Sequence, residues 1–300
     1  MPIPLGSRTI YLGTLIAVLA LSVGLSAATP VPGTPAKNPQ PNAQQTALAN
    51  CICTMVIPCL PDDQKNRAAQ KKRECKLKVT NCDEHADALA EYGIDAAARA
   101  NGEDPPQGAE RDAAKAMVKP VIKEKSKGTA GAAGEGEMTF LADAKNMNNV
   151  YFKKLVVIEE TNHTAQQDSG ARLAAAGVTT GDPEKDKKLQ AAWEHYLEVE
   201  AQLPAVKFGQ MKVNGLQGDE KKKAAAALHV YMRSTRNHIT ELCMLLGMLG
   251  GLPAGPAKDM VDKMEACKKD GRAVFNAAAA LTNQVLNPPP KQRHEPIPED

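Results

Sequence analysis

Residues 219–249 read DEKKKAAAALHVYMRSTRNHITELCMLLGML and carry the strongest periodic pattern in the chain. Apolar or small side chains recur there at steps of four and three, at Leu228, Met232, Thr235, Ile239, Leu242, Leu246 and Leu249. This spacing places them on one face of an α-helix. The pattern predicts a long helix from Asp219 to about Leu249 that packs through this face.

A second periodic segment follows directly after a break at Gly250-Gly251-Leu252-Pro253. It extends from Pro256 to about Asn287 and repeats the spacing at Met260, Met264, Cys267, Gly271, Val274, Ala278, Leu281 and Val285. Two long amphipathic segments joined by a short Gly/Pro turn indicate an antiparallel helical hairpin. Three prolines, residues 288–290, predict the end of the second helix.

The composition favours a mainly α fold outside this hairpin as well. The 300 residues include 47 alanines, while aromatic residues make up only 3%. Alanine has the highest helix propensity, and the residues that favour strands are sparse over most of the chain. One exception is 150–161, where Val150, Tyr151, Phe152 and the run 155–158 suggest a short strand, with a buried helical turn as the alternative. A further helix through Trp193 is expected to end before Pro204.

Changes in composition divide the chain into successive regions. We expect a signal peptide or anchor at 1–28, a Pro-rich linker at 29–50, a Cys-rich helical region at 51–125, a flexible Gly-rich linker at 126–137, a helical domain at 138–287 ending in the hairpin, and a disordered tail at 288–300. The last helix of the Cys-rich region is expected to stop at Pro120. The sequence SKGTAGAAGEGE at 126–137 is expected to form no stable element, because it consists of glycine, small and charged residues.

The N-terminal segment has the pattern of an export signal. Arg8 precedes an uncharged apolar run from Ile10 to Leu25, and small residues follow up to Ala28. We expect cleavage after Ala27 or Ala28 and a secreted or periplasmic protein. The alternative is an uncleaved membrane anchor, because the run approaches the roughly 20 residues that span a bilayer.

Seven cysteines support the same assignment to a compartment outside the cytoplasm. They are Cys51, Cys53, Cys59, Cys75, Cys82, Cys243 and Cys267. Clustered cysteines in an exported protein are typical of disulfides, so we expect a disulfide-stapled N-terminal region and one odd cysteine. A local bridge between Cys243 and Cys267 depends on the register of the hairpin, and the alternative is a pairing between the hairpin and the N-terminal cluster. The spacing C-x-C-x5-C from Cys51 to Cys59 lacks the paired C-x2-C of zinc sites, so we expect neither a bound metal nor another cofactor.

Glutamate and histidine supply the only candidates for catalysis. Glu160 and His163 have an E-x-x-H spacing that places both on one helical face, as in di-metal carboxylate bundles. His238 and Glu241 have the reversed spacing, and His195 lies on another predicted helix. These five residues are able to converge as a metal or acid/base cluster, although scattered polar residues on helix surfaces produce the same spacings.

His229, Arg233 and Arg236 form a cationic stripe beside the apolar face of the helix at 219–249. Such a stripe either binds an anionic group or is the solvated shoulder of an amphipathic helix.

The overall charge gives no field that would attract nucleic acid, since 37 basic and 35 acidic residues leave a net charge of +2. The sequence contains no nucleotide-binding, serine-hydrolase or zinc-protease motif. We therefore expect an exported helical module that binds another protein or a cell-surface component, with contact to a membrane only through an uncleaved N-terminus. The alternative is a secreted hydrolase or toxin that acts on an envelope or host substrate.

Overall fold

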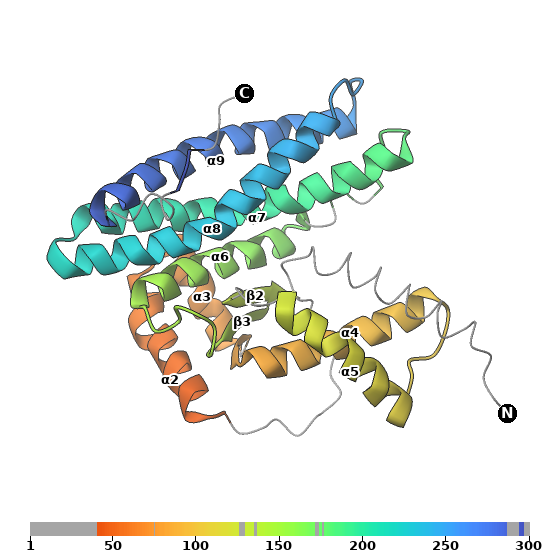
Figure 1. The fold of residues 1–300 in the computed structure, drawn as a ribbon, viewed down its shortest axis with the longest axis horizontal. Coiled ribbons are helices and arrows are strands. Elements are labelled where there is room, and N and C mark those ends of the chain that lie inside the picture. Colours follow the sequence, from red (N-terminus) through yellow and green to blue (C-terminus); the bar gives the residue numbers. More distant parts are fainter. Residues whose placement is uncertain are drawn as a thin grey trace.

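The computed structural model describes residues 41–74, 76–125, 130–134, 137–171, 174–175, 177–286 and 294–296. The predicted signal peptide, the N-terminal part of the Pro-rich linker and Cys75 lie outside the described residues. The described part is mainly helical and contains one small three-stranded sheet (Figure 1). The prediction of a mainly α fold is confirmed.

Four helices form the C-terminal bundle: α6 (Val150–Asp168), α7 (Pro183–Gly215), α8 (Gly218–Met248) and α9 (Pro256–Leu286). Helices α8 and α9 pack against each other and against α7, which confirms the predicted hairpin. All seven residues of the predicted α8 face are at most 3% exposed. The periodic pattern therefore identified the core-facing side of α8 correctly.

Helix α7 continues through Pro204, so the predicted end before this residue is wrong. A proline inside a helix removes one backbone hydrogen bond and costs about 3 kcal/mol. Buried side chains on both sides of the proline, including Val199, Leu203 and Val206, offset this cost through packing. Tertiary contacts therefore keep a helix continuous that its local sequence would interrupt.

The predicted strand at 150–161 is also wrong, because these residues form the N-terminal part of α6. Asn149 caps this helix by accepting hydrogen bonds from the backbone N–H groups of Tyr151 and Phe152. Helix α6 lies between the sheet on one side and α7 and α8 on the other (Figure 1). Val156, Val157 and Ile158 are all buried, because a helix covered on both sides has no continuous polar face. Its sequence consequently resembles that of a buried strand.

The sheet has the order β1-β3-β2, with β1 (Leu77–Thr80) parallel to β3 (Glu137–Leu141) and β2 (Gly131–Gly134) antiparallel to β3. Residues 131–134 of the predicted Gly-rich linker therefore form a strand, contrary to expectation. Gly131 explains why this composition suits the position. A Cβ atom on Gly131 would lie 2.8 Å from Oε1 of Glu160 and 2.9 Å from Cγ1 of Val156. Only glycine allows β2 to approach α6 this closely.

The N-terminal region begins with α2 (Ala43–Cys51), which continues through a π-helical turn (Ile52–Val56) and a 3₁₀ turn (Ile57–Cys59). Asn42 and Gln45 form a capping box at the start of α2, so the predicted linker gives way to a helix from Ala43. Helix α3 (Asp62–Arg73) follows. These elements pack on α6 and complete the main core.

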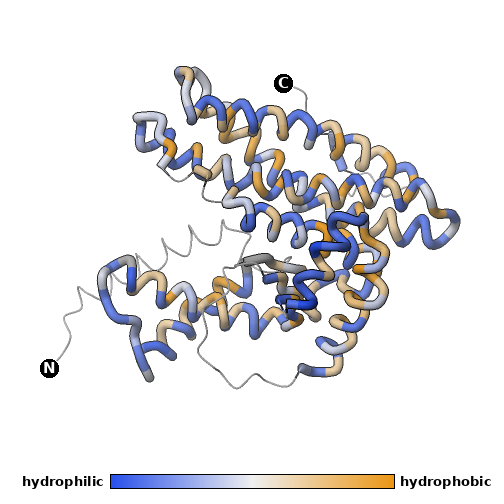
Figure 2. The backbone as a smooth tube through the Cα atoms, turned by 180° about the vertical axis from the view of Figure 1, so that it is seen from behind, coloured by the Kyte–Doolittle hydropathy of each residue, from blue (hydrophilic) through white to orange (hydrophobic). Residues whose placement is uncertain are grey.

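Helices α4 (Cys82–Ala100) and α5 (Gly108–Lys125) form a separate hairpin with its own small core. Helix α5 continues through Pro120, so its predicted end is wrong as well. Apolar and polar residues alternate along both helices, as they do along the bundle (Figure 2). Ile94 and Ile122 are fully buried between the two helices, which compensates for the proline through packing.

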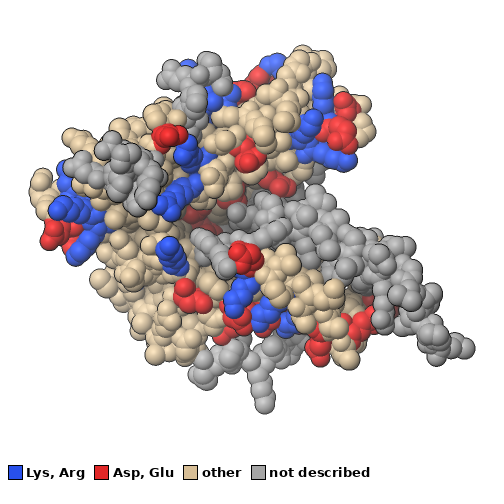
Figure 3. Space-filling model, viewed as in Figure 1, with Lys and Arg blue, Asp and Glu red and all other residues tan. Residues whose placement is uncertain are grey.

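The surface of the described part mixes charges of both signs. On the face shown in Figure 3, Lys and Arg side chains alternate with Asp and Glu side chains over most elements. None of the described helices is long and apolar enough to cross a bilayer.

The contact of Gly209 with α8 provides a test of this packing. A Cβ atom on Gly209 would lie 2.7 Å from Cδ1 of the fully buried Leu228. We expect Gly209→Val to lower the free energy of unfolding by about 1–3 kcal/mol through overpacking. Gly247→Val is the matched control, because a Cβ on Gly247 meets nothing within 4 Å. Urea unfolding of both variants measures the difference, and equal stabilities would contradict this packing.

Candidate metal centre

A buried polar cluster lies where α6, α7 and α8 meet. Its central contact joins Nε2 of His163 on α6 to Oε2 of Glu198 on α7, at 3.3 Å. Both side chains are almost inaccessible to solvent, with 1% and 6% exposed. Polar side chains this deeply buried are stable only when paired with partners that satisfy their hydrogen bonds.

Gln166 fixes the orientation of the His163 ring. The amide nitrogen of Gln166 donates to the backbone oxygen of Leu197 and to Glu200, both at 2.9 Å. Its amide oxygen lies 3.1 Å from Nδ1 of His163 and must accept, so Nδ1 carries a proton. This leaves Nε2 as the ring nitrogen that faces the cluster. A carboxamide or carboxylate that holds one ring nitrogen in this way is typical of metal-binding histidines.

Glu159 completes a set of three possible ligands. It lies one helical turn before His163 on α6, and its Oε1 accepts a hydrogen bond of 2.8 Å from Gln202 on α7. One ligand atom from each of Glu159, His163 and Glu198 lies within 4.8 Å of the other two. Ligands bound to one ion at 2.0–2.2 Å are at most about 4.4 Å apart. A small inward movement would therefore bring all three onto one ion.

The electrostatics of the cluster favour a bound positive charge. Burial raises the pKa of Glu159, and the neighbouring Glu198 carboxylate raises it further. Burial alone would lower the pKa of His163, but the charge and hydrogen bond of Glu198 outweigh this effect and raise it. The cluster therefore holds protons at neutral pH. A divalent cation is able to replace these protons.

Oxygen atoms on the neighbouring helices are oriented towards the same region. The hydroxyl of Tyr231 on α8 is buried and lies against the Glu159 carboxyl group. Burial raises the pKa of Tyr231, and the negative charge and hydrogen bond of Glu159 contribute next. Oε1 of Gln202 is buried without a partner among the described residues. Because orphaned buried oxygens are rare, the cluster has the capacity to accept a further group.

A second pair of histidines lies on the side of α7 and α8 that is closer to solvent. Nδ1 of His195 and Nδ1 of His238 are 3.0 Å apart. Both rings are half-buried, and burial lowers the pKa of each. Both imidazoles are therefore neutral at pH 7, the form that binds metals. Glu241, one turn beyond His238, is exposed.

The structure brings together only some of the residues proposed from the sequence. His163 meets Glu198, and His195 meets His238, but Glu160 packs beside Gly131 of β2. Glu159 and Glu198 were not predicted from the sequence. Two spacings contained them: Glu159 is four residues before His163, and Glu198 is three residues after His195.

The cationic stripe lies against the C-terminal segment of the same chain. The ring centres of His294 and His229 lie 4.1 Å apart, and Nε2 of His294 lies 2.8 Å from the backbone oxygen of His229. Glu295 approaches Arg236 at 3.8 Å, while Arg233 is exposed. His294 is only 7% exposed, so the prediction of a disordered tail is wrong for residues 294–296. The remainder of that tail lies outside the described residues.

No disulfide joins the six described cysteines, so the predicted disulfide-stapled region and the Cys243–Cys267 bridge are not found. Protonation gives a physical reason at two positions. Burial raises the pKa of Cys267 to about 12, with a further contribution from Glu200. Burial and a hydrogen bond with Asp143 raise the pKa of Cys82 to about 11. Disulfides form from thiolates, which these environments disfavour.

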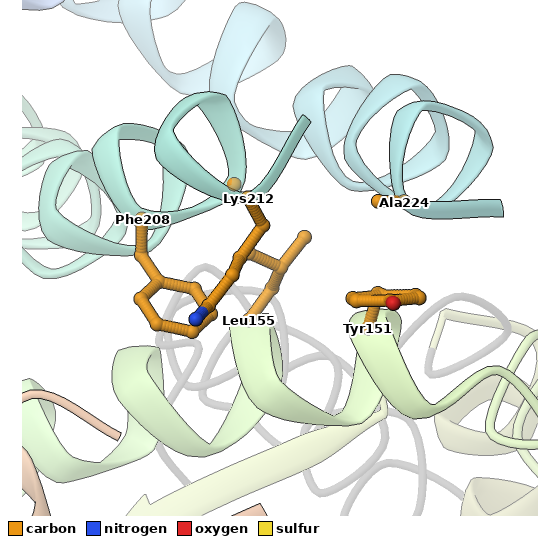
Figure 4. Close-up of a pocket in the computed structure, with 6 residues that line it drawn as sticks. Tyr151, Leu155, Phe208, Lys212 and Ala224 are labelled. Carbon is orange, nitrogen blue, oxygen red and sulfur yellow. The ribbon is translucent and has the colours of Figure 1, made fainter. Parts of the chain in front are cut away.

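A small pocket lies between α6, α7 and α8 near the ends of α7 and α8 (Figure 4). Its walls are Tyr151, Leu155, Phe208, Gly209, Lys212 and Ala224. The amino group of Lys212 lies 5.1 Å from the centre of the Phe208 ring. The pocket volume is about 10 Å³, which is room for one water molecule. None of the candidate catalytic residues lines it.

Comparison with known proteins adds no assignment. No protein-family model, curated protein or solved structure matches this chain.

The docking of His294 predicts a dependence on pH. Burial lowers the pKa of His294, and the nearby Arg236 and Arg233 contribute, while the hydrogen bond to His229 opposes them. Because the docked form prefers neutral imidazole, docking is stable above the unperturbed pKa of about 6.5 and weakens as the pH falls below it. Hydrogen exchange at residues 294–296, compared at pH 7.5 and pH 5 after correction for intrinsic rates, should show this loss of protection.

His294→Gln supplies the control for this prediction, because glutamine retains a side-chain donor for the His229 carbonyl but does not titrate. Phe275 on α9 also faces this ring, with the two ring centres 5.6 Å apart. In this variant the protection ratio between the two pH values should approach one. An equally strong pH dependence in the variant would show that another group controls docking.

Proposed function

We propose that the protein binds a divalent metal ion through Glu159, His163 and Glu198. The observation that carries this proposal is the convergence of three ligand atoms within 4.8 Å in a buried site. One imidazole and two carboxylates suit Zn²⁺, Mn²⁺ and Fe²⁺. Gln166 and Gln202 would hold His163 and Glu159 in place, as residues around metal ligands commonly do.

Within such a centre the residues of this chain have separate roles. Nε2 of His163 would offer a lone pair once its proton is released, while Nδ1–H remains on Gln166. Glu159 and Glu198 would supply the negative charge that balances the ion. Binding would then release protons to solvent and add to the stability of the folded state, because the site does not exist in the unfolded chain.

Metal titration tests the proposal directly. Protein stripped with a chelator should bind Zn²⁺ or Mn²⁺ in isothermal titration calorimetry. At a free metal concentration 100 times the dissociation constant, the folded state should gain about 2.7 kcal/mol, which appears as a rise in melting temperature. Absence of both binding and stabilisation would refute the proposal.

Two variants locate the site. Glu159→Gln and Glu198→Gln keep the side-chain size but remove a charge, and each should weaken binding about 100-fold or more, since even residues that only support a ligand contribute 10–100-fold. Glu184→Gln on the exposed start of α7 is the control and should bind normally. Circular dichroism must show that each variant is folded. Normal affinity in both variants would place the metal elsewhere.

We also propose that the chain is exported and recognises another protein or a cell-surface component. The N-terminal pattern at 1–28 supports export. Exposed methionines, which adapt readily to different partner surfaces, support recognition of a macromolecule; they include Met55, Met117, Met211, Met244 and Met248. The hydrolase alternative is less favoured, because His163, one of its candidate catalytic groups, is closed to solvent.

The export proposal predicts a defined mature N-terminus. Mass spectrometry of the protein expressed in its own host should find cleavage after Ala27 or Ala28 in the extracytoplasmic fraction, because a signal peptidase requires small residues there. An intact N-terminus in the membrane fraction would indicate the anchor instead. An intact N-terminus in the cytoplasmic fraction would contradict export.

A further inference from the structure

We propose that the buried centre is the inner half of a two-metal centre whose outer position is formed by His195 and His238, with Glu198 between the two positions. This inference rests on the proposed function, since it assumes an ion at Glu159, His163 and Glu198. It gives the His195–His238 pair, which the inner position does not use, the role of metal ligands.

The geometry of the histidine pair suits a shared metal ion. Two nitrogens bound to a tetrahedral ion at 2.0–2.1 Å are about 3.3 Å apart. The Nδ1 atoms of His195 and His238 are 3.0 Å apart. Opening the pair by about 0.3 Å would therefore admit an ion. In the metal-free state the same contact is a hydrogen bond between neutral rings, in which one ring donates its Nδ1 proton to the other. Metal binding would require this proton to move to Nε2.

Glu198 lies near both positions, and its carboxylate would move to reach the outer one, since within the described part Glu159, His163 and Glu198 are the only set of three candidate ligands with atoms within 4.8 Å of one another. His195 and Glu198 are three residues apart on α7, so they lie on the same face of the helix. Glu198 contacts His163 at 3.3 Å on its buried side. Its charge also acts on both His195 and His238. A carboxylate between two positions is suited to bridge two ions, as in helical bundles that bind metal pairs.

The outer position has the access to solvent that the inner position lacks. His195 and His238 are half-buried, whereas His163 is 1% exposed. Glu241 lies one helical turn beyond His238, is exposed, and acts electrostatically on both histidines. This carboxylate would supply a further ligand at the solvent edge after a side-chain movement, since its oxygens do not lie within 4.8 Å of both histidine nitrogens. Two neutral imidazoles with a carboxylate favour Zn²⁺ or a similar transition metal over Mg²⁺ and Ca²⁺.

Metal stoichiometry tests this inference and separates it from the proposed function. The full chain, stripped of metal and then titrated with Zn²⁺, should bind two equivalents. His195→Gln and His238→Gln should each bind one equivalent, while Glu159→Gln should lose the inner ion. His294→Gln is the histidine-matched control and should bind two. Circular dichroism confirms that each variant is folded.

The other outcomes are equally informative. The wild-type protein could bind one equivalent that is lost in Glu159→Gln but kept in His195→Gln. This result would overturn the two-metal centre but keep the inner site. If the wild-type protein binds one equivalent and only the histidine variants lose it, both the two-metal centre and the proposed function are overturned. No bound Zn²⁺ would overturn the two-metal centre, and binding of neither Zn²⁺ nor Mn²⁺ would overturn the proposed function as well. Where two equivalents bind, Mn²⁺ loading tests the bridge: a spin-coupled electron paramagnetic resonance spectrum supports Glu198 as a shared ligand, and two uncoupled Mn²⁺ signals contradict it.

Discussion

The buried contact between His163 and Glu198 is the constraint around which the helical core is arranged. Removing one partner of such a pair typically costs 3–5 kcal/mol, because the other is left buried without compensation. Helix α6 therefore cannot slide or rotate against α7 without a large loss of stability. Gln166 and Gln202 extend this constraint, since each links α6 to α7 through a side-chain amide. The same contacts that fix the helices also fix the geometry of the candidate ligands.

Small residues allow the surrounding elements to approach this polar core. Gly131 lets β2 pack directly against α6, and Gly209 lets α7 pack against Leu228 of α8. On α9, a Cβ atom on Gly271 would lie 3.1 Å from Val199 of α7. With few aromatic residues to fill space, the fold achieves dense packing by bringing backbones close together. The cluster is therefore enclosed by tightly packed helices, which exclude water and strengthen its electrostatic interactions.

The position of the cluster links the proposed metal binding to the stability of the fold. The three proposed ligands come from α6 and α7, so an ion bound there would hold these two helices together, and an ion at His195 and His238 would add α8. Binding energy would then be available to the folded state alone. The histidine pair is more exposed to solvent than the buried His163. A macromolecular partner that contacts α7 or α8 would accordingly bind to elements whose packing depends on the occupancy of the centre.

The spacing of apolar residues in the sequence was sufficient to predict an element where one of its faces is buried and the opposite face is solvated. Helices α8 and α9 have such faces, and their hairpin follows from periodicity and the Gly/Pro turn. The same spacing gave a wrong prediction for α6, which is buried on both sides. The prediction was also wrong for β2, where Gly131 is explained only by the close approach of Glu160 and Val156. Pro120 and Pro204 were misread as helix ends because packing elsewhere along α5 and α7 outweighs their local cost.

The sequence by itself determined a mainly helical fold, the C-terminal hairpin and the candidate histidines, because these depend on helix propensity and on spacing along one segment. Only the tertiary structure decided that His163 pairs with Glu198 rather than with Glu160, and that His195 faces His238. The partners in these pairs are more than 31 positions apart in the sequence, so they meet only through the rotation and offset of whole helices. No local spacing encodes that arrangement, since it results from the packing of all the helices at once.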